Sequence, residues 1–271
     1  MDAVLLFSGQ GAQKVGMGKD LYDQYPVAKA LIEQADKALG ESLSAVMFEG
    51  PGEELTRTCN CQPALYVHGL ACLAVLKELV PSLNPVAAAG LSLGEFTAHA
   101  AAGTYSFEEG LRLVQKRGAF MEEACNATKG TMAAMIGGTD ENVIKLAQEC
   151  DVDVANFNCP GQTVVSGTEE GVAKAVAGAK AAGCKIAKKL NVAGAYHSRL
   201  MHSAMVKLAE ELKNISFGTP SMPVYCNYEA RVVEGPDDIR SMLEHQVCGS
   251  VRWTASCLLY TSPSPRDMRR S

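Results

Sequence analysis

The sequence has no excess of positive charge and no uninterrupted apolar run long enough to cross a membrane. Its 271 residues carry 25 Lys and Arg against 30 Asp and Glu, a net charge of −5, which argues against a nucleic-acid partner. The stretch LYVHGLACLAVLKELV is interrupted by His68 and Lys77 and is typical of a buried helix, so we expect no membrane partner. The N-terminus, MDAVLLFSGQG, lacks the basic region of a targeting peptide. We therefore expect a cytoplasmic protein, or one of an organellar matrix with its transit peptide absent.

Cysteines at the spacings of a zinc site or a disulfide framework are also missing. The ten cysteines are scattered, Cys59 and Cys61 form the one close pair, and no C-x-x-C occurs. Without a secretory signal, this spacing predicts reduced thiols, with neither a disulfide framework nor a zinc site.

A possible nucleophile stands in the pentapeptide Gly90-Leu91-Ser92-Leu93-Gly94. The pattern G-x-S-x-G is short enough to occur by chance, and Ser92 could be just a serine among small residues. Its surroundings favour catalysis, because an apolar run at 86–89 predicts a strand before it and residues 95–102 predict a helix after it. Strand, tight turn and helix form the setting of a nucleophile elbow.

The order of predicted elements divides the chain into a core and an insertion. Apolar runs at 4–7 and 86–89, with helical patterns at 26–39, 63–79 and 108–125, predict an α/β core with a largely parallel sheet. Between 130 and 191 the order is strand, helix, strand, strand, helix, strand, which is the ferredoxin-like βαββαβ pattern. We expect a core of residues 1–129 and 192–256, with a subdomain of residues 130–191 inserted into it.

An activated serine needs a base within hydrogen-bond reach. Among five histidines, His197 follows Gly194-Ala195-Tyr196 at a predicted strand-to-helix junction, where functional side chains are often carried. The other four lie in helical patterns, where a packed or surface role is more common: His68, His99, His202 and His245.

Seven motifs occur in order along the chain: FSGQGAQKVGMGKDL, QPAL, GLSLGEFTA, RLVQKRGAFM, NFNCPGQTVVSG, GAYHSRLM and HQVCGSVRW. Together they resemble the malonyl-CoA:acyl carrier protein transacylase family, over about residues 5–256. The resemblance implies an α/β-hydrolase-like core with an inserted ferredoxin-like subdomain. One departure is Leu91, where many bacterial members of the family have histidine.

The resemblance also implies roles for individual residues. Ser92 is the implied nucleophile, His197 its general base, and Gln246 the residue beside the histidine that helps orient it in place of an acid. The implied oxyanion hole combines Gln10 with the backbone N–H of Leu93. Arg117 is the implied partner of the malonyl carboxylate. The remaining substrate-binding residues are Met121, Tyr196, Gln62 and Asn158. From the residues alone, Arg117 beside Lys116 is more typical of a solvated surface arginine, Gln10 of a turn, and Gln246 of a helix surface.

The implied reaction moves a malonyl group from malonyl-CoA to the serine, and then to the phosphopantetheine thiol of acyl carrier protein, in a ping-pong scheme that serves fatty-acid synthesis. We expect no metal or other cofactor, a monomer, and a basic face for the acidic carrier at Lys185, Lys188 and Lys189. Alternatives are a serine esterase or thioesterase, an acyltransferase fragment of a polyketide synthase, and a fragment that does not fold.

The last residues, 257–271, read CLLYTSPSPRDMRRS. A disordered basic tail is one interpretation. We favour another, because CLLYTSPSPRD resembles one reading frame of an adaptor used in sequencing libraries. We therefore expect residues 257–271 to be non-native and the native chain to be truncated near Ser256.

Overall fold

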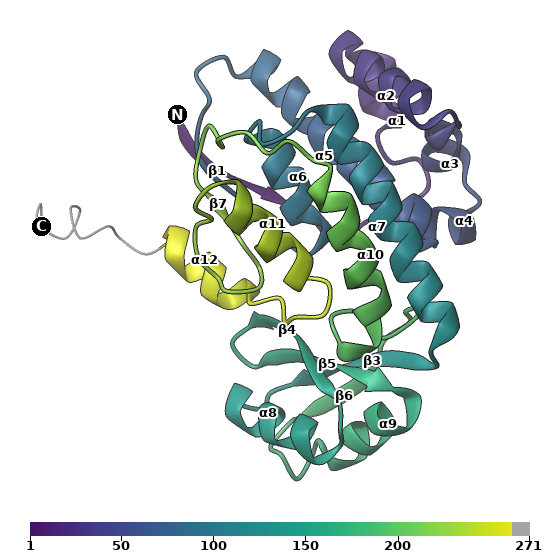
Figure 1. The fold of residues 1–271 in the computed structure, drawn as a ribbon, viewed down its shortest axis with the longest axis vertical. Coiled ribbons are helices and arrows are strands. Elements are labelled where there is room, and N and C mark those ends of the chain that lie inside the picture. The colour runs from purple at the N-terminus through teal and green to yellow at the C-terminus, as the bar shows by residue number, and fades with distance from the viewer. Residues whose placement is uncertain (262–271) are drawn as a thin grey trace, which may run out of the picture.

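A parallel sheet lies in the upper part of the molecule (Figure 1). In the computed structural model, which describes residues 1–261, it is built from β1 (Asp2–Phe7), β2 (Asn84–Gly90) and β7 (Val224–Tyr225), in the order β1-β2-β7. β1 pairs with β2 from Asp2↔Asn84 to Phe7↔Gly90. The loop after β1 and the pentapeptide after β2 therefore start side by side. The carboxyl ends of neighbouring parallel strands are where α/β folds place ligands.

Long helices pack around this sheet. α5 (Thr58–Leu79) contacts α6 (Leu93–Ala101) and α7 (Phe107–Ala127). α10 (His202–Lys213) lies along α7 and also contacts α11 (Pro236–His245). α5 is long and apolar enough to cross a membrane by length and composition, but over half of its most apolar window is buried inside the protein. It begins at Thr58, earlier than the predicted start at Pro63, because Pro63 is accommodated inside the helix.

The N-terminal helices form a separate layer at the upper right of Figure 1. They are α1 (Lys19–Gln24), α2 (Pro26–Leu39), α3 (Leu43–Glu49) and α4 (Gly52–Thr56). α2 has the bounds that the sequence predicts, since Pro26 opens it and Gly40, with a φ of 71°, closes it.

The lower lobe holds an antiparallel sheet. β3 (Gly130–Ile136), β4 (Asp153–Cys159), β5 (Gln162–Thr168) and β6 (Ile186–Lys189) pair in the order β4-β5-β3-β6. α8 (Asp140–Glu149) follows β3 and α9 (Glu169–Gly178) follows β5, which gives the predicted βαββαβ order. Side chains alternate along β3, so that Ala133 and Met135 pack with the residues of α8 and α9 while Met132 and Ala134 join the main core. One face of this sheet is thereby directed at the upper lobe.

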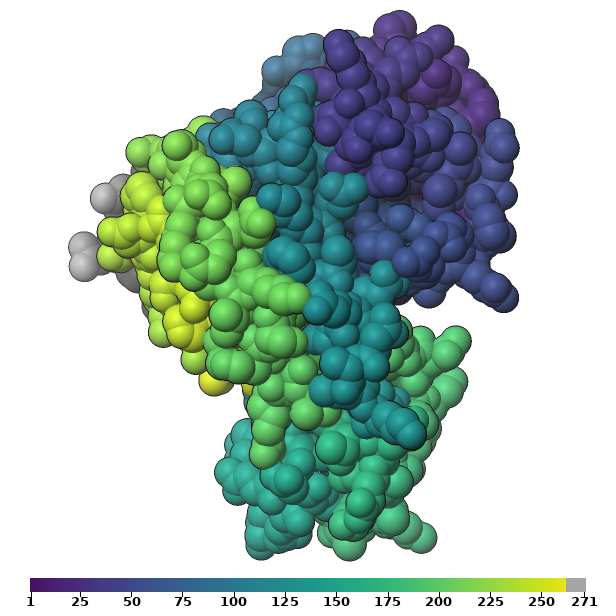
Figure 2. Space-filling view, turned by 45° about the vertical axis from the view of Figure 1, so that its right-hand side comes forward, coloured from purple at the N-terminus to yellow at the C-terminus, as the bar shows by residue number. Residues whose placement is uncertain are grey.

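The two lobes are joined by the chain after α11. The N–H of Val251 donates to the carbonyl of Ala155 (2.8 Å), and the N–H of Phe157 donates to the carbonyl of Val251 (2.9 Å). The space-filling view shows an indentation between the blue N-terminal helices and the green lower lobe (Figure 2). The predicted helix at 198–213 opens as a 3₁₀ turn, η1 (Arg199–Met201), before α10.

The last described helix is α12 (Trp253–Thr261). It continues through the predicted junction at Ser256, and Tyr260 packs edge-on against Tyr225 of β7 with ring centroids 5.5 Å apart. The rest of the segment that the sequence predicts to be non-native, residues 262–271, lies outside the described residues.

Candidate active site

Ser92 occupies a sharp turn between β2 and α6. Its φ of 54° and ψ of −105° are unusual for a residue with a side chain. The turn requires glycine on both sides of Leu91-Ser92-Leu93, because neither flanking position has room for a side chain. A Cβ on Gly90 would overlap the carbonyl group of Gly94, and a Cβ on Gly94 would overlap the carbonyl of Phe7. The pentapeptide therefore has the geometry of a nucleophile elbow.

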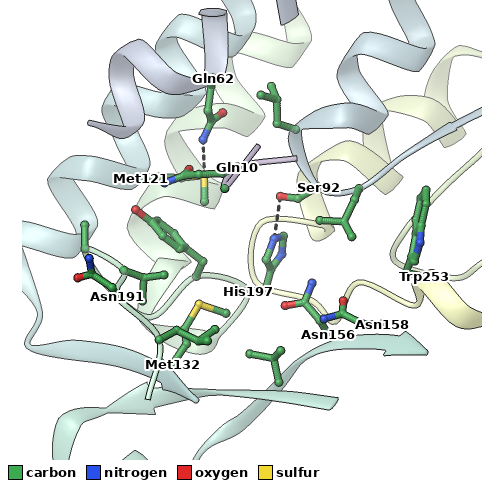
Figure 3. Close-up of a pocket in the computed structure, with 18 of the residues that line it drawn as sticks. Gln10, Gln62, Ser92, Met121, Met132, Asn156, Asn158, Asn191, His197 and Trp253 are labelled. Carbon is green, nitrogen blue, oxygen red and sulfur yellow. Dashed lines mark hydrogen bonds between the residues drawn. The ribbon is translucent and has the colours of Figure 1, made fainter. Parts of the chain in front are cut away.

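His197 faces this serine (Figure 3). The Ser92 Oγ lies 2.8 Å from Nε2 of His197, and Nδ1 lies 2.9 Å from the backbone carbonyl of Gln246. A carbonyl can only accept, so Nδ1 carries the proton and Nε2 is left free to accept the serine O–H. Burial first, and the charge of Arg117 second, lower the pKa of His197 to about 4. The imidazole is therefore a neutral acceptor at physiological pH.

Gln246 lies beside the histidine, and its backbone carbonyl is the atom that orients the ring. Its side chain links Arg117, Ser92 and Glu95 by hydrogen bonds. Oε1 accepts from a terminal nitrogen of Arg117 (2.9 Å), while Nε2 donates to the carbonyl of Ser92 (3.0 Å) and to Oε2 of Glu95 (2.6 Å). Gln246 is fully buried, so its interpretation as a helix-surface glutamine is wrong.

Arg117 is buried too, with 1% of its surface exposed, which overturns its interpretation as a solvated surface arginine. Its guanidinium donates to Oε1 of Gln62 (2.7 Å) and to Oγ of Ser92 (3.2 Å). It also lies over the ring of Phe96, 5.0 Å from the centroid. Burial lowers the pKa of Arg117 to about 10, and the charge of Glu95 opposes that shift. A cation therefore adjoins the nucleophile at neutral pH.

A cavity of about 670 Å³ opens at the dyad between the two lobes. This volume suits a small organic ligand. Of the ten predicted site residues, Gln246 is the one that does not line the cavity. The nine that line it are Gln10, Gln62, Ser92, Leu93, Arg117, Met121, Asn158, Tyr196 and His197. The hydroxyl of Tyr196 hydrogen-bonds Thr58 (2.7 Å), and Nε2 of Gln62 donates to the sulfur of Met121 (3.4 Å). The lower lobe contributes Met132, Val164 and Leu190.

Comparison with known proteins agrees with this geometry. The sequence profile of the acyl transferase domain matches residues 4–255. The chain belongs to the acyl transferase family. A malonyl CoA-acyl carrier protein transacylase of Bacillus subtilis is 43% identical to it over 256 residues, which cover 93% of this chain and 80% of the relative.

Solved structures of the family superpose closely on this acyl transferase. An acyl carrier protein S-malonyltransferase from Vibrio cholerae has a TM-score of 0.92 at 36% identity, over 96% of this chain and 86% of that one. A malonyl-transacylase solved in complex with a type II polyketide synthase acyl-carrier protein has a TM-score of 0.92 at 37% identity, over 95% of this chain and 84% of that one. The α/β architecture with its second, antiparallel sheet is thus that of the family's transacylases.

Two residues at the centre of this acyl transferase were not predicted from the sequence. Glu95, in the first turn of α6, has no exposed surface, and burial raises its pKa to about 7. Asn227, just after β7, is fully buried and accepts the N–H of Ser92 at Oδ1 (2.6 Å). Both left a signal in the sequence. Glu95 is the one acid in a helix of mostly apolar residues, and Asn227 is the last residue of the strand that the sequence predicts at 223–227, where functional polar groups gather.

Proposed function

We infer that this acyl transferase moves the malonyl group of malonyl-CoA to the phosphopantetheine thiol of acyl carrier protein, and so loads extender units for fatty-acid synthesis. The observation that carries the inference is a buried guanidinium, that of Arg117, in direct contact with the nucleophile of a Ser-His dyad. A cation at that place suits an acyl group that ends in a carboxylate. The relatives named above, which are malonyl transacylases, support the same reaction.

The first half-reaction forms a malonyl ester on Ser92. The serine O–H passes its proton to Nε2 of His197 as Oγ attacks the thioester carbonyl. The backbone N–H of Leu93, at the start of α6, and the Gln10 loop are the proposed donors to the tetrahedral oxyanion, a contribution typically worth about 3 kcal/mol. The imidazolium of His197 is acidic, because its pKa is lowered to about 4, and it gives its proton to the departing CoA thiolate as the bond from sulfur to the acyl carbon breaks.

The second half-reaction runs these steps in reverse with a new thiol. His197 takes the proton of the phosphopantetheine thiol, the sulfur attacks the ester, and Ser92 leaves with the proton returned. Throughout, Arg117 holds the malonyl carboxylate, while Met121 and Tyr196 line the acyl pocket beside Gln62. Asn158 is a proposed contact for the pantetheine chain. Each half-reaction balances without an added reagent, so we propose that no metal or other cofactor takes part.

The carrier protein would dock beside the cavity mouth. Lys188 and Lys189 are exposed at the end of β6, and the chain continues from them directly into Leu190 and Asn191 of the cavity wall. With Lys185 they offer positive charge to an acidic carrier. The transacylase solved with its acyl-carrier protein supports such a partner. We further propose a monomer, since one chain supplies every group of the site, in the cytoplasm or an organellar matrix.

The alternatives are less well supported. A simple esterase has no use for a buried guanidinium against its nucleophile, which costs folding energy. The relatives cited for this reaction are named as malonyl transacylases of acyl carrier protein, which does not favour a fragment of a polyketide synthase.

The test is intact mass spectrometry after mixing the protein with malonyl-CoA. We expect the mass to rise by one malonyl group, to fall back when holo acyl carrier protein is added, and to stay unchanged in Ser92→Ala. Loss of the malonyl group to water at the same rate without the carrier would make the protein a hydrolase.

A further inference from the structure

Glu95 is a buried carboxyl group to which the transfer steps assign no role. Its Oε2 accepts the backbone N–H of Asn227 (2.9 Å) and Nε2 of Gln246 (2.6 Å). Its Oε1 has no hydrogen-bond donor among residues 1–261. Burying a carboxylate with an oxygen left unpaired lowers stability, so the fold alone gives no reason for an acid here.

The two groups bound to Glu95 hold the backbone of the nucleophile. Asn227 accepts the Ser92 N–H at Oδ1 (2.6 Å) and donates from Nδ2 to the carbonyl of Gly90 (2.8 Å). Gln246 donates to the Ser92 carbonyl (3.0 Å). Both backbone polar groups of Ser92 are therefore held by the side chains of two residues that each donate to the same carboxylate oxygen, Asn227 from its backbone N–H and Gln246 from its amide. A residue with φ 54° and ψ −105° keeps such a conformation only when its surroundings fix it.

Glu95 also sets which way the Gln246 amide faces. That amide lies between the guanidinium of Arg117, which donates to Oε1, and the carboxylate of Glu95, which accepts from Nε2. The reversed amide would place its NH₂ group against the cation and its oxygen against the anion. Opposite charges on the two sides thus fix the amide, and the backbone carbonyl of the same residue orients His197.

We propose that Glu95 is a positioning residue that acts through Asn227 and Gln246 to hold Ser92 in its reactive geometry. The inference rests on the proposed acyl transfer. It requires that loss of the Glu95 bonds slow attack on every acyl thioester, because the displaced group is the nucleophile itself. A displacement of about 1 Å costs on the order of 100-fold in rate. Loss of Arg117 would instead discriminate between malonyl and acetyl groups.

The experiment compares Glu95→Ala with Glu95→Gln. Glutamine keeps a carbonyl oxygen that can accept both hydrogen bonds, whereas alanine keeps none. The readout is the rate constant of acyl-enzyme formation, followed by rapid-quench mass spectrometry with malonyl-CoA and with acetyl-CoA. Rates are divided by the fraction of protein that can be acylated, so that misfolded molecules do not count. The matched control is Leu208→Ala, which removes a buried core side chain from α10 and leaves the network intact.

We expect Glu95→Ala to acylate about 100-fold more slowly with both thioesters. Glu95→Gln should recover to within about tenfold of the wild type, and Leu208→Ala should keep the wild-type rate per acylatable molecule. If Glu95→Ala does not fold, Asn227→Ser tests the same hydrogen-bond network at the residue that joins Glu95 to the Ser92 N–H. The same loss of acylation rate is expected with both thioesters.

Three results would overturn the inference: a wild-type rate in Glu95→Ala or in a folded Asn227→Ser, a loss confined to malonyl-CoA, or a Glu95→Gln as slow as Glu95→Ala. A wild-type protein that gains no malonyl group would remove the proposed function, and this inference with it.

Discussion

Replacement of Arg117 by alanine tests how the site selects its acyl group. Malonyl differs from acetyl by one carboxylate, which loses its water on entering the cavity. A buried guanidinium can compensate for that loss through two parallel hydrogen bonds. Arg117→Ala removes the cation, while Arg117→Lys keeps a charge without the fork. We therefore expect the malonyl preference to fall steeply in the alanine variant and by a smaller factor in the lysine variant.

The magnitude follows from the burial of Arg117, 1% of which is exposed. Truncating one partner of a buried, hydrogen-bonded charge pair costs about 2–5 kcal/mol. At tenfold per 1.4 kcal/mol, this is roughly 30-fold to several-thousand-fold in kcat/KM for malonyl-CoA. Because Arg117 also touches Oγ of Ser92 and Oε1 of Gln246, some loss with acetyl-CoA is expected as well. The quantity to compare is therefore the ratio of the two values of kcat/KM.

The assay measures kcat/KM for both thioesters in wild type, Arg117→Ala and Arg117→Lys at one ionic strength. Arg112→Ala is the matched control, since Arg112 lies on the same helix with its side chain half exposed and paired to Glu108. We expect the malonyl-to-acetyl ratio in Arg117→Ala to drop by the malonyl loss of about 30-fold or more divided by the smaller loss with acetyl-CoA, and to stay level in the control. If both thioesters lose by the same factor, Arg117 supports the fold or the CoA moiety, and the reasoning on specificity fails.

Three further predictions concern the base, the elbow and the buried acid. Because the pKa of His197 is lowered to about 4, the neutral base persists as the pH falls, and the acylation rate should decline only near pH 4; a midpoint near 6.5 would contradict this. Gly90→Ala should lower the acylation rate by about 100-fold, because its Cβ meets the Gly94 carbonyl, whereas Gly52→Ala, with its nearest contact at 3.8 Å, should not. The raised pKa of Glu95 means that its contribution to stability is greatest below the unfolded pKa of about 4.5 and is lost as the pH rises through about 7. Urea unfolding should show Glu95→Gln gaining about 3 kcal/mol over wild type between pH 4.5 and pH 8, and an unchanged difference would mean that Glu95 titrates normally.

The parts of the fold that could be predicted are those whose ends are marked by proline or glycine. Pro26 and Gly40 delimit α2, and Pro160-Gly161 separates β4 from β5 in the predicted βαββαβ order. The short helices α1, α3 and α4 were not predicted, because five to seven residues carry too little periodicity. The bounds of α11 were not predicted either, although His245 was placed in a helical pattern; Pro236 at its first turn and the two acidic residues after it are start signals.

In the site, the identity of the functional residues could be predicted from the sequence more readily than their burial and their contacts. Ser92 and His197 stand at junctions that sequence patterns identify, and the structure brings them to 2.8 Å. Lys116 and Arg117 look alike in sequence, but one helical step of about 100° places them on different faces of α7. Lys116 reaches Glu211 on the exposed surface, and Arg117 enters the core. The use of the Gln246 backbone carbonyl could not be predicted, since sequence does not say which atom of a residue faces its partner.

Several unfavourable features of this molecule gather at one point. Ser92 and His197 both have a φ near 55°, which costs on the order of 1–3 kcal/mol for residues of this kind. The pKa of Glu95 is raised and that of Arg117 lowered by burial, so each would be better solvated elsewhere. All four meet through Gln246, which bonds Ser92, Glu95, Arg117 and His197. Because this network lowers folding stability while it holds the nucleophile, a mutation in it should raise stability without raising the acylation rate. Glu95→Gln should be more stable than wild type above pH 7 yet no faster, which is the behaviour expected when strain serves catalysis.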